Sequence, residues 1–275
     1  MSKAWDPDFA ERAPAFEPLR AVARALHCAS FPDCDGLNRL VAARSASLRT
    51  ASGHELRFVG QSQRQPAFED KYEPRVYLRG EVQLRAGNWH DLFNALVWLT
   101  FPRAKAALNE RQFRLLERRR AGNRGPAQDA LTLFDECGVI VATSDPAASA
   151  LLTSHAWKEL FWRRRAGLAL HMRFYLFGHA LFEHMLQPFV GVTGRGILCA
   201  VGPEFFALPP ERQIDHLDRQ LASLIADPAR LVATRELAPV PMLGIPGWSP
   251  DNELEQYYDN TAYFRPARVA IERRG

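Results

Sequence analysis

The sequence has few cysteines and no long apolar run, and each shortage excludes a class of protein. The four cysteines of the 275-residue chain include no Cys-x-x-Cys pair, which argues against a disulfide framework. The longest nearly uninterrupted apolar stretch, Leu92 to Phe101, is about half of what a membrane-spanning helix needs. Met1 to Arg12 contains acidic residues and no apolar core, unlike an export signal. We therefore expect a cytoplasmic protein with reduced thiols and no membrane span.

The sequence also lacks the common catalytic signatures. It has no Gly-rich phosphate loop, no Gly-x-Ser-x-Gly motif and no dinucleotide-binding fingerprint, and Gly191 to Gly196 has the wrong glycine spacing for any of them. With 47% hydrophobic and 24% charged residues, the composition is that of a globular protein. Sequence alone leaves open whether the protein is an enzyme, what its substrate is and how many copies assemble.

Hydrophobic periodicity predicts an α+β fold that is predominantly helical, with a few short strands. Helices are predicted at 14–29, 36–48, 89–101, 103–120, 127–136, 147–165, 178–186 and 210–226. Strands are predicted at 54–60, 75–84, 139–142, 168–177 and 194–201. No linker or internal repeat interrupts the pattern, so we expect residues 1–275 to form a single globular domain.

Several segments resemble one bacterial family in their order and content. They are Asn88 to Pro102, Lys105 to Asn109, Asp129 to Glu136, Phe177 to Leu181, Gly244 to Trp248, Tyr258-Asp259 and Phe264 to Pro266. Together they resemble the family called domain of unknown function 3025, over most of the chain. The resemblance implies a main family core over 88–275, preceded by N-terminal helices and a loop over 1–87. It implies no activity, ligand or catalytic residue.

Polar side chains interrupt the apolar helix predicted from Trp89. His90 and Asn94 are four residues apart and share a face, and Asp91 lies beside them. If this helix is buried, each polar group needs a partner or costs about 1 to 3 kcal/mol. A metal or a ligand can be that partner. The alternative is that Asp91 caps the helix while His90 and Asn94 hold a loop.

Acidic side chains line one side of the helix predicted at 127–136. Asp129, Thr132 and Glu136 fall at positions i, i+3 and i+7, and Asp135 adjoins that face. Carboxylates brought close together can hold a divalent cation or act as acid and base. The alternative is a solvated acidic face beside a basic neighbour.

The sharpest pair in the sequence is His179 and Glu183, four residues apart on an otherwise apolar helix. Such a pair can bind one metal from a single face. The order His-x-x-x-Glu-His matches neither metallopeptidase motif, because His184 points about 140° away from His179 on an ideal helix. The alternative is a buried histidine hydrogen-bonded to a glutamate, and the sequence favours it for this pair alone.

Convergence of these three helices would create a site for metal-assisted hydrolysis. The predicted divalent-metal ligands are His90, Asp129, His179 and Glu183, and the predicted catalytic residues are Asp91, Glu136, His179 and Glu183, with Asp135 nearby. The metal would lower the pKa of a bound water, and a remaining carboxylate would act as base. A small-molecule ligand would then occupy the polar space around it.

A second hypothesis comes from the arginines, because the net charge of +4 has its basic excess in the middle of the chain. The basic residues there are Arg111, Arg114, Arg118, Arg119, Arg120 and Arg124, followed by Arg163, Arg164 and Arg165 near Trp157, Phe161 and Trp162. Such a surface can neutralise phosphates while aromatic rings stack on bases, which suits a nucleic-acid or partner-binding protein without catalysis. The alternative is a solvated helix side next to core aromatics.

Overall fold

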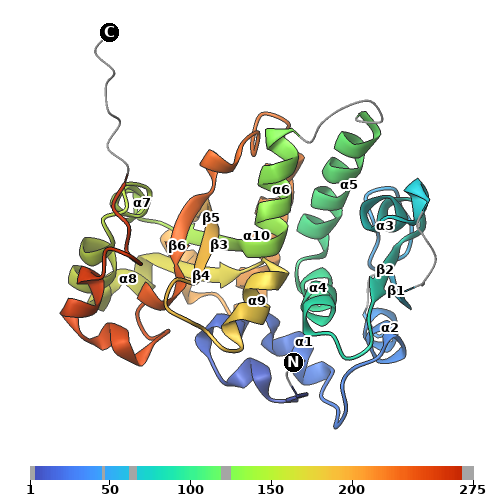
Figure 1. The fold of residues 1–275 in the computed structure, drawn as a ribbon, viewed down its shortest axis with the longest axis horizontal. Coiled ribbons are helices and arrows are strands. Elements are labelled where there is room, and N and C mark those ends of the chain that lie inside the picture. The colour runs from blue at the N-terminus through green and yellow to red at the C-terminus, as the bar shows by residue number, and fades with distance from the viewer. Residues whose placement is uncertain (1–3, 45–46, 62–66, 119–124, 268–275) are drawn as a thin grey trace.

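The computed structural model describes residues 4–44, 47–61, 67–118 and 125–267, and it confirms the predicted α+β class. A mixed sheet has the strand order β4-β3-β5-β6, in which β3 runs parallel to β5 and antiparallel to β4 (Figure 1). A smaller parallel sheet joins β1 to β2. The strands are β1 Arg57–Gly60, β2 Glu81–Leu84, β3 Gly138–Thr143, β4 Met172–Leu176, β5 Thr193–Ala200 and β6 Ala238–Pro241.

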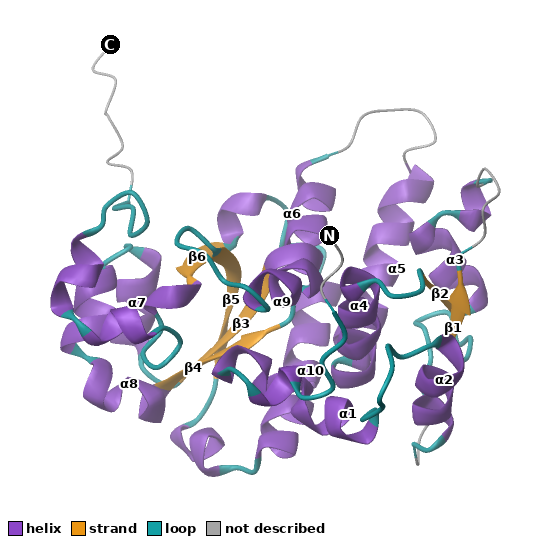
Figure 2. Cartoon of the chain, turned by 60° about the horizontal axis from the view of Figure 1, so that its bottom comes forward, coloured by secondary structure: helices purple, strands orange, loops and turns teal. Residues whose placement is uncertain are grey.

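Two helices, α4 (Trp89–Thr100) and α5 (Pro102–Arg118), lie between the two sheets (Figures 1 and 2). Helix α4 begins where the Asn88 side chain accepts a hydrogen bond from the backbone N–H of Asp91, at 3.0 Å. Pro102, which fits the first turn of a helix but not its interior, starts α5. Most of α4 is buried, as its near-continuous apolar sequence requires.

The remaining helices cover the sheets and the ends of the molecule. They are α1 Arg20–Ala25, α2 Cys34–Ala42, α3 Tyr72–Arg79, α6 Pro126–Cys137, α7 Pro146–Thr153, α8 Arg165–His171, α9 His179–Met185 and α10 Pro210–Ala226. Short 3-10 segments build much of the N-terminal part, such as Pro14–Leu19, and the C-terminal part, such as Glu255–Asp259. Strand β3 is buried along its whole length, which explains its uninterrupted run of apolar residues.

Several predicted elements were wrong in part; the helix predicted at 36–48, for example, ends at Ala42. The segment 75–79 is the end of helix α3 rather than a strand, because Gly80 ends the helix at a φ of +70° and only 81–84 forms β2. The segment 168–171 belongs to α8, and the strand begins at Met172. The helix predicted at 147–165 ends at Thr153, followed by His155 at a φ of +59° and a π-helical turn at Glu159–Arg163.

Among the described residues, no helix combines the length and the apolar character needed to cross a bilayer.

Candidate metal centre

Strand pairing brings the end of one helix to the start of another. Helix α6 ends at Cys137, just before β3, and α9 begins at His179, just after β4. Because β3 and β4 are antiparallel, with Val139 opposite Leu176, the chain enters one strand where it leaves the other. Glu136 and His179 therefore meet at this edge of the sheet. Gly178 makes the approach possible, since a Cβ there would collide with the backbone at 136–138.

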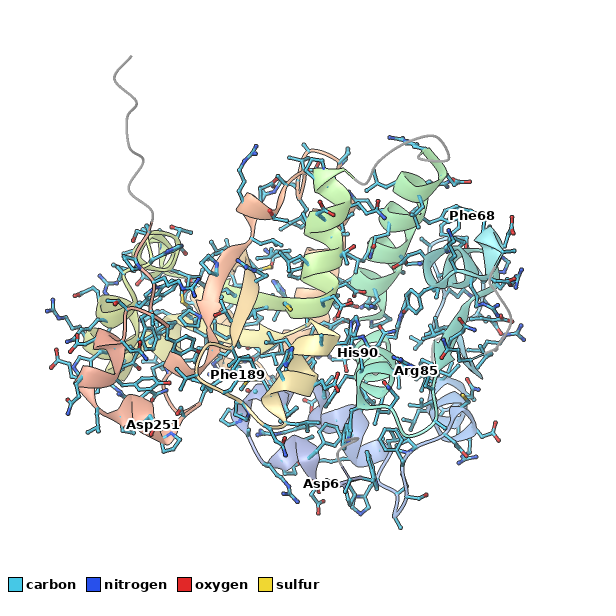
Figure 3. The ribbon with its side chains drawn as sticks, viewed as in Figure 1. Asp6, Phe68, Arg85, His90, Phe189 and Asp251 are labelled. Atoms are coloured by element: carbon cyan, nitrogen blue, oxygen red, sulfur yellow. The ribbon has the colours of Figure 1, made fainter. Side chains whose placement is uncertain are left out.

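Aromatic packing adds the third helix. Phe93 of α4 stacks on Phe182 of α9, with ring centroids 5.6 Å apart. His90 precedes Phe93 by three residues, and His179 precedes Phe182 by three. Each histidine therefore lies one helical turn from its phenylalanine, on the helix face where α4 and α9 touch. Their imidazoles meet edge to face, with ring centroids 4.4 Å apart. Figure 3 shows His90 at the centre of the molecule, between the two sheets.

The three side chains present their donor atoms to one point. The Nε2 atoms of His90 and His179 are 3.0 Å apart. Glu136 Oε2 lies 3.5 Å from Nε2 of His179 and 3.9 Å from Nε2 of His90. Donor atoms about 2.0 to 2.1 Å from one metal ion are separated by about 2.9 to 3.4 Å. Across the described ranges, these are the residues whose ligand atoms gather within 4.8 Å of one another. The geometry fits a divalent cation after a small inward adjustment of Glu136.

Each imidazole has a carboxylate behind its other nitrogen. Glu183 Oε2 lies 3.3 Å from Nδ1 of His90, and Asp135 Oδ2 lies 4.0 Å from Nδ1 of His179. In metal centres such carboxylates fix the ring orientation and raise ligand basicity. Burial lowers the pKa of His179 to about 4, so the ring is neutral at about pH 7 and keeps a lone pair for a cation.

A buried lysine holds one of these carboxylates in place. Lys105, on α5, is 2% exposed and donates to Asp135 Oδ1 at 2.5 Å and to Asn94 Oδ1 at 2.9 Å. Burial would raise the pKa of Asp135, but the adjacent ammonium outweighs it and holds that pKa below its usual value. The Asn94 amide donates in turn to the hydroxyl of Tyr72, at 2.8 Å. The network joins α3, α4, α5 and α6 beneath the candidate centre.

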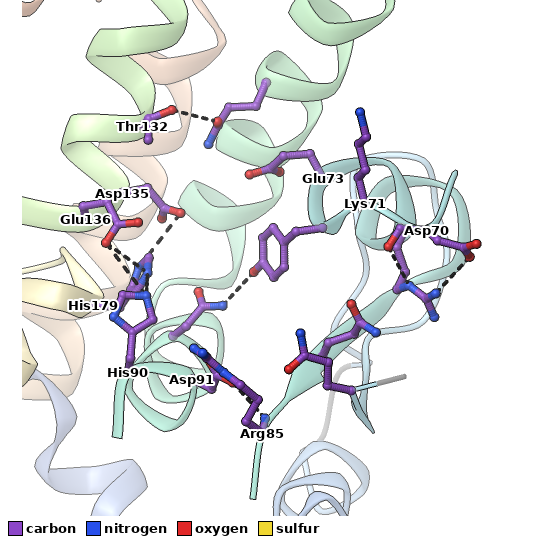
Figure 4. Close-up of a pocket in the computed structure, with 16 residues that line it drawn as sticks. Asp70, Lys71, Glu73, Arg85, His90, Asp91, Thr132, Asp135, Glu136 and His179 are labelled. Carbon is purple, nitrogen blue, oxygen red and sulfur yellow. Dashed lines mark hydrogen bonds and ion pairs between the residues drawn. The ribbon is translucent and has the colours of Figure 1, made fainter. Parts of the chain in front are cut away.

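The centre opens into a cavity of about 790 Å³. His90, Glu136 and His179 form one wall, and Lys71 and Glu73 stand on the opposite one (Figure 4). Burial is the main cause that raises the pKa of Glu73 to about 8, and the negative charge of Asp135 adds to it. A hydrogen bond that Asn109 donates to Glu73 Oε2 at 2.5 Å acts in the opposite direction but is weaker. This carboxyl group therefore holds a proton at about pH 7.

The predicted site residues fall into different positions. His90, Glu136 and His179 share the centre, and Glu183 contacts His90 rather than His179. Asp91 lines the cavity and accepts hydrogen bonds at 2.8 Å from Arg85. Asp129 is exposed on α6 and is not among the gathered ligands, because seven residues of helix separate it from Glu136 by about 10 Å.

Sequence reasoning missed Lys105, Tyr72 and Glu73. Lys105 carried one signal, because it is one of only four lysines among 35 basic residues and stands in an apolar helical stretch. Tyr72 and Glu73 carried none, since they begin a short helix that follows a polar segment.

The arginines of the second hypothesis mostly make contacts within the protein. Arg111 donates to backbone carbonyls at the end of α10, including Ile225 at 2.9 Å. Arg114 donates to the hydroxyl of Tyr77, and Arg165 pairs with Glu253 at 2.6 Å. Arg118 is exposed, while Arg119, Arg120 and Arg124 lie outside the described residues.

Comparisons with known proteins give one match. Neither the curated proteins nor the solved structures include one with significant similarity to this chain. Residues 56–268 match the family described as "Protein of unknown function (DUF3025)". The match begins ahead of residue 88, so strands β1 and β2 lie within it. Because the match covers well over half of the sequence, the chain belongs to the DUF3025 family.

Proposed function

We propose that this protein binds one divalent metal ion through His90, His179 and Glu136 and uses it to hydrolyse a small polar substrate. The observation that carries the proposal is the convergence of three donor atoms, from three helices, on one point at the wall of a cavity. Two imidazoles and one carboxylate form a ligand set of catalytic zinc sites, which leave a coordination position for water or substrate.

The chemistry follows from that ligand set. A divalent cation held by His90, His179 and Glu136 would supply Lewis-acid chemistry, activating a water near neutral pH and polarising a carbonyl or phosphoryl group. The net reaction would be addition of one water across the bond that breaks, its hydroxyl going to the acyl or phosphoryl group and its proton to the leaving group. Glu136 acts as a ligand in this proposal, while Glu183 and Asp135 orient the two imidazoles.

Charge supports a cation at this place. Glu136, Glu183 and Asp135 bring three negative charges to the two imidazoles, and Lys105 offsets one of them. The remaining two match the charge of a divalent ion. Without a cation, three carboxylates would be held around the two imidazoles, an arrangement that electrostatic repulsion between the carboxylates disfavours.

We place this activity in the cytoplasm, as expected from the sequence, and the four cysteines are free thiols in the structure. Nucleic-acid binding has less support. Arg111, Arg114 and Arg165 are engaged with other groups of the protein, so their guanidinium groups are not held ready for phosphates.

Elemental analysis by mass spectrometry on untagged protein purified without chelator tests the metal site. We expect about one Zn or Mn per chain, and a higher melting temperature on adding the metal, because a ligand at 100 times its Kd stabilises the folded state by about 2.7 kcal/mol. His179→Ala and His90→Ala should lose both effects. His184→Ala, on the exposed side of α9, is the matched control and should keep them.

The outcomes separate clearly. Metal bound equally by wild type, His179→Ala and His184→Ala would place the ion elsewhere and refute the site. Protein that carries no metal and gains no thermal stability from Zn, Mn or Mg would refute the proposal and leave the two histidines as a structural pair. If metal binds, hydrolysis of chromogenic esters, amides and phosphoesters should depend on it and should disappear in Glu136→Ala.

A further inference from the structure

The hydroxyl oxygen of Tyr72 accepts two hydrogen bonds. The side-chain amide of Asn94 donates to it at 2.8 Å, and the indole Nε1 of Trp98 donates to it at 3.1 Å. The hydroxyl also carries one proton that it can donate. Neither neighbour can accept that proton, because an amide NH2 group and an indole N–H are donors only. The Tyr72 proton therefore needs a third partner.

The orientation of the Asn94 amide is fixed by its other contact. Its Oδ1 faces the ammonium group of Lys105 at 2.9 Å, and an ammonium group has three donors and no acceptor. A flipped amide would set two donors against each other at that contact. The NH2 group of Asn94 must therefore face Tyr72, so both neighbours of the Tyr72 oxygen are donors.

The remaining direction for the Tyr72 proton is the cavity. Within the described ranges, no side chain or backbone carbonyl accepts a hydrogen bond from this hydroxyl. Tyr72 lines the cavity of about 790 Å³ that also contains His90, Glu136 and His179 (Figure 4). Burial raises the pKa of Tyr72 to about 12, so the hydroxyl keeps its proton near neutral pH.

Position and polarity both connect this hydroxyl to the candidate metal centre. Asn94 follows His90 by four residues on α4, so the two side chains share a face, with about 5 to 6 Å between their Cβ atoms. Hydrogen bonds run in one direction from Lys105 to Asn94 and from Asn94 to Tyr72. Such a chain polarises its members, and the positive charge at its start makes the final hydroxyl a stronger donor.

We propose that Tyr72 is a further catalytic residue, whose hydroxyl donates a hydrogen bond to the substrate oxygen that gains negative charge during hydrolysis. This role rests on the proposed function, whereas the direction of the proton rests on the hydrogen bonds of Tyr72 alone. Tyr72 transfers no proton in this step, and no covalent bond to it forms or breaks. A donor already aimed at the developing charge lowers the barrier, because it does not have to reorganise during the reaction.

Two replacements of Tyr72 test the direction of its proton in metal-free protein. Tyr72→Phe removes the acceptor for Asn94 and Trp98, and should lower the melting temperature by about 4 °C or more. O-methyltyrosine at position 72 keeps the acceptor oxygen and replaces the proton by a methyl group, which has room only if it points into the cavity. This protein should melt within about 2 °C of wild type. A drop as large as that of Tyr72→Phe would overturn the proposal.

Acetohydroxamate, a small anion that binds metal ions through its oxygens, tests the role in zinc-loaded protein. Calorimetry should show that Tyr72→Phe weakens acetohydroxamate about 10- to 100-fold, the value of a hydrogen bond to a charged group, while zinc affinity is unchanged. Tyr77→Phe is the matched control, because Tyr77 lies on the same helix outside the cavity lining and its hydroxyl accepts from Arg114. It should leave both affinities unchanged. If Tyr72→Phe does not fold, the O-methyltyrosine protein takes its place.

Each outcome decides one question. Unchanged acetohydroxamate affinity in the Tyr72 variant would overturn the role of Tyr72 and leave the metal site intact. Parallel losses of zinc and acetohydroxamate affinity would make Tyr72 a structural residue only, which also overturns the role. Protein that takes up no zinc would refute the proposed function, and the catalytic role of Tyr72 with it. The melting temperatures of metal-free protein would still decide where the hydroxyl proton points.

Discussion

Replacing Lys105 by methionine tests whether the buried network beneath the metal centre determines stability. The ammonium group is 2% exposed and lies 2.5 Å from Asp135 Oδ1, 2.9 Å from Asn94 Oδ1 and 5.5 Å from the centroid of the Trp98 ring. Methionine has a similar length and keeps most of the packing. What it removes is the positive charge and the donated hydrogen bonds, so the change isolates the polar contribution.

The expected loss is large because Asp135 would stay buried without its partner. Removing one member of a buried ion pair costs about 3 to 5 kcal/mol, and the uncompensated charge accounts for most of it. The free energy of unfolding of a typical domain is about 5 to 15 kcal/mol. Without Lys105, burial would raise the pKa of Asp135 above its unfolded value. The defect should therefore shrink as the pH falls and Asp135 is protonated.

Urea denaturation of metal-free protein measures this effect, with Asp135→Asn and the double variant completing a cycle. We expect Lys105→Met to lose about 3 to 5 kcal/mol and the double variant to lose less than the sum of the single losses, because the pair is removed together. A loss below about 1 kcal/mol in Lys105→Met at neutral pH, or additive losses, would show that the pair is not coupled as the distances indicate. Zinc affinity should also fall about 10- to 100-fold, because in the proposed site Asp135, 4.0 Å from Nδ1 of His179, would orient that ring.

Other substitutions give independent tests of the same structure. Glu73→Gln should be more stable than wild type by a margin that grows between about pH 4.5 and pH 8. The wild-type protein loses stability as the pH rises through this window, because the pKa of Glu73 is about 8 in the folded state and lower in the unfolded chain. A margin independent of pH would contradict a buried, protonated carboxyl. Gly178→Ala should cost about 1 to 3 kcal/mol and weaken metal binding, because its Cβ would collide with the backbone at 136–138. Gly167→Ala is the control, since its Cβ meets open space on α8 and the change should be neutral or stabilising. Thermal melts with and without zinc distinguish the two. Arg111→Met should destabilise by about 1 to 3 kcal/mol through the carbonyls it leaves without a donor, and Arg118→Met by about 0.5 kcal/mol or less. Equal losses for the two arginines in urea would show that the carbonyl contacts contribute nothing.

Helices whose ends are marked by caps or prolines in the sequence could be predicted. The helices at 89–101, 127–136 and 210–226 were predicted within about two residues, because caps, prolines and apolar periodicity define them within one segment. The segment 75–79 was not, since its alternating apolar residues fit a strand as well as a helix. Its conformation depends on the parallel pairing of β2 with β1, a contact between residues 24 apart in sequence.

The site shows why spacing within a helix is insufficient to define a metal centre. His179 and Glu183 are correctly spaced to share an ion, yet the arrangement of α4 beside α9 puts His90 between them and turns Glu183 into the partner of His90. Asp129 and Glu136 are equally plausible ligands on one helix face, but only the end of α6 that leads into β3 meets the start of α9. The choice between them is made by the register of two strands and by one stacked aromatic pair, both formed from residues distant in sequence. The donor types can therefore be read from the chain, whereas the combination of donors that can hold an ion is a property of the packed fold.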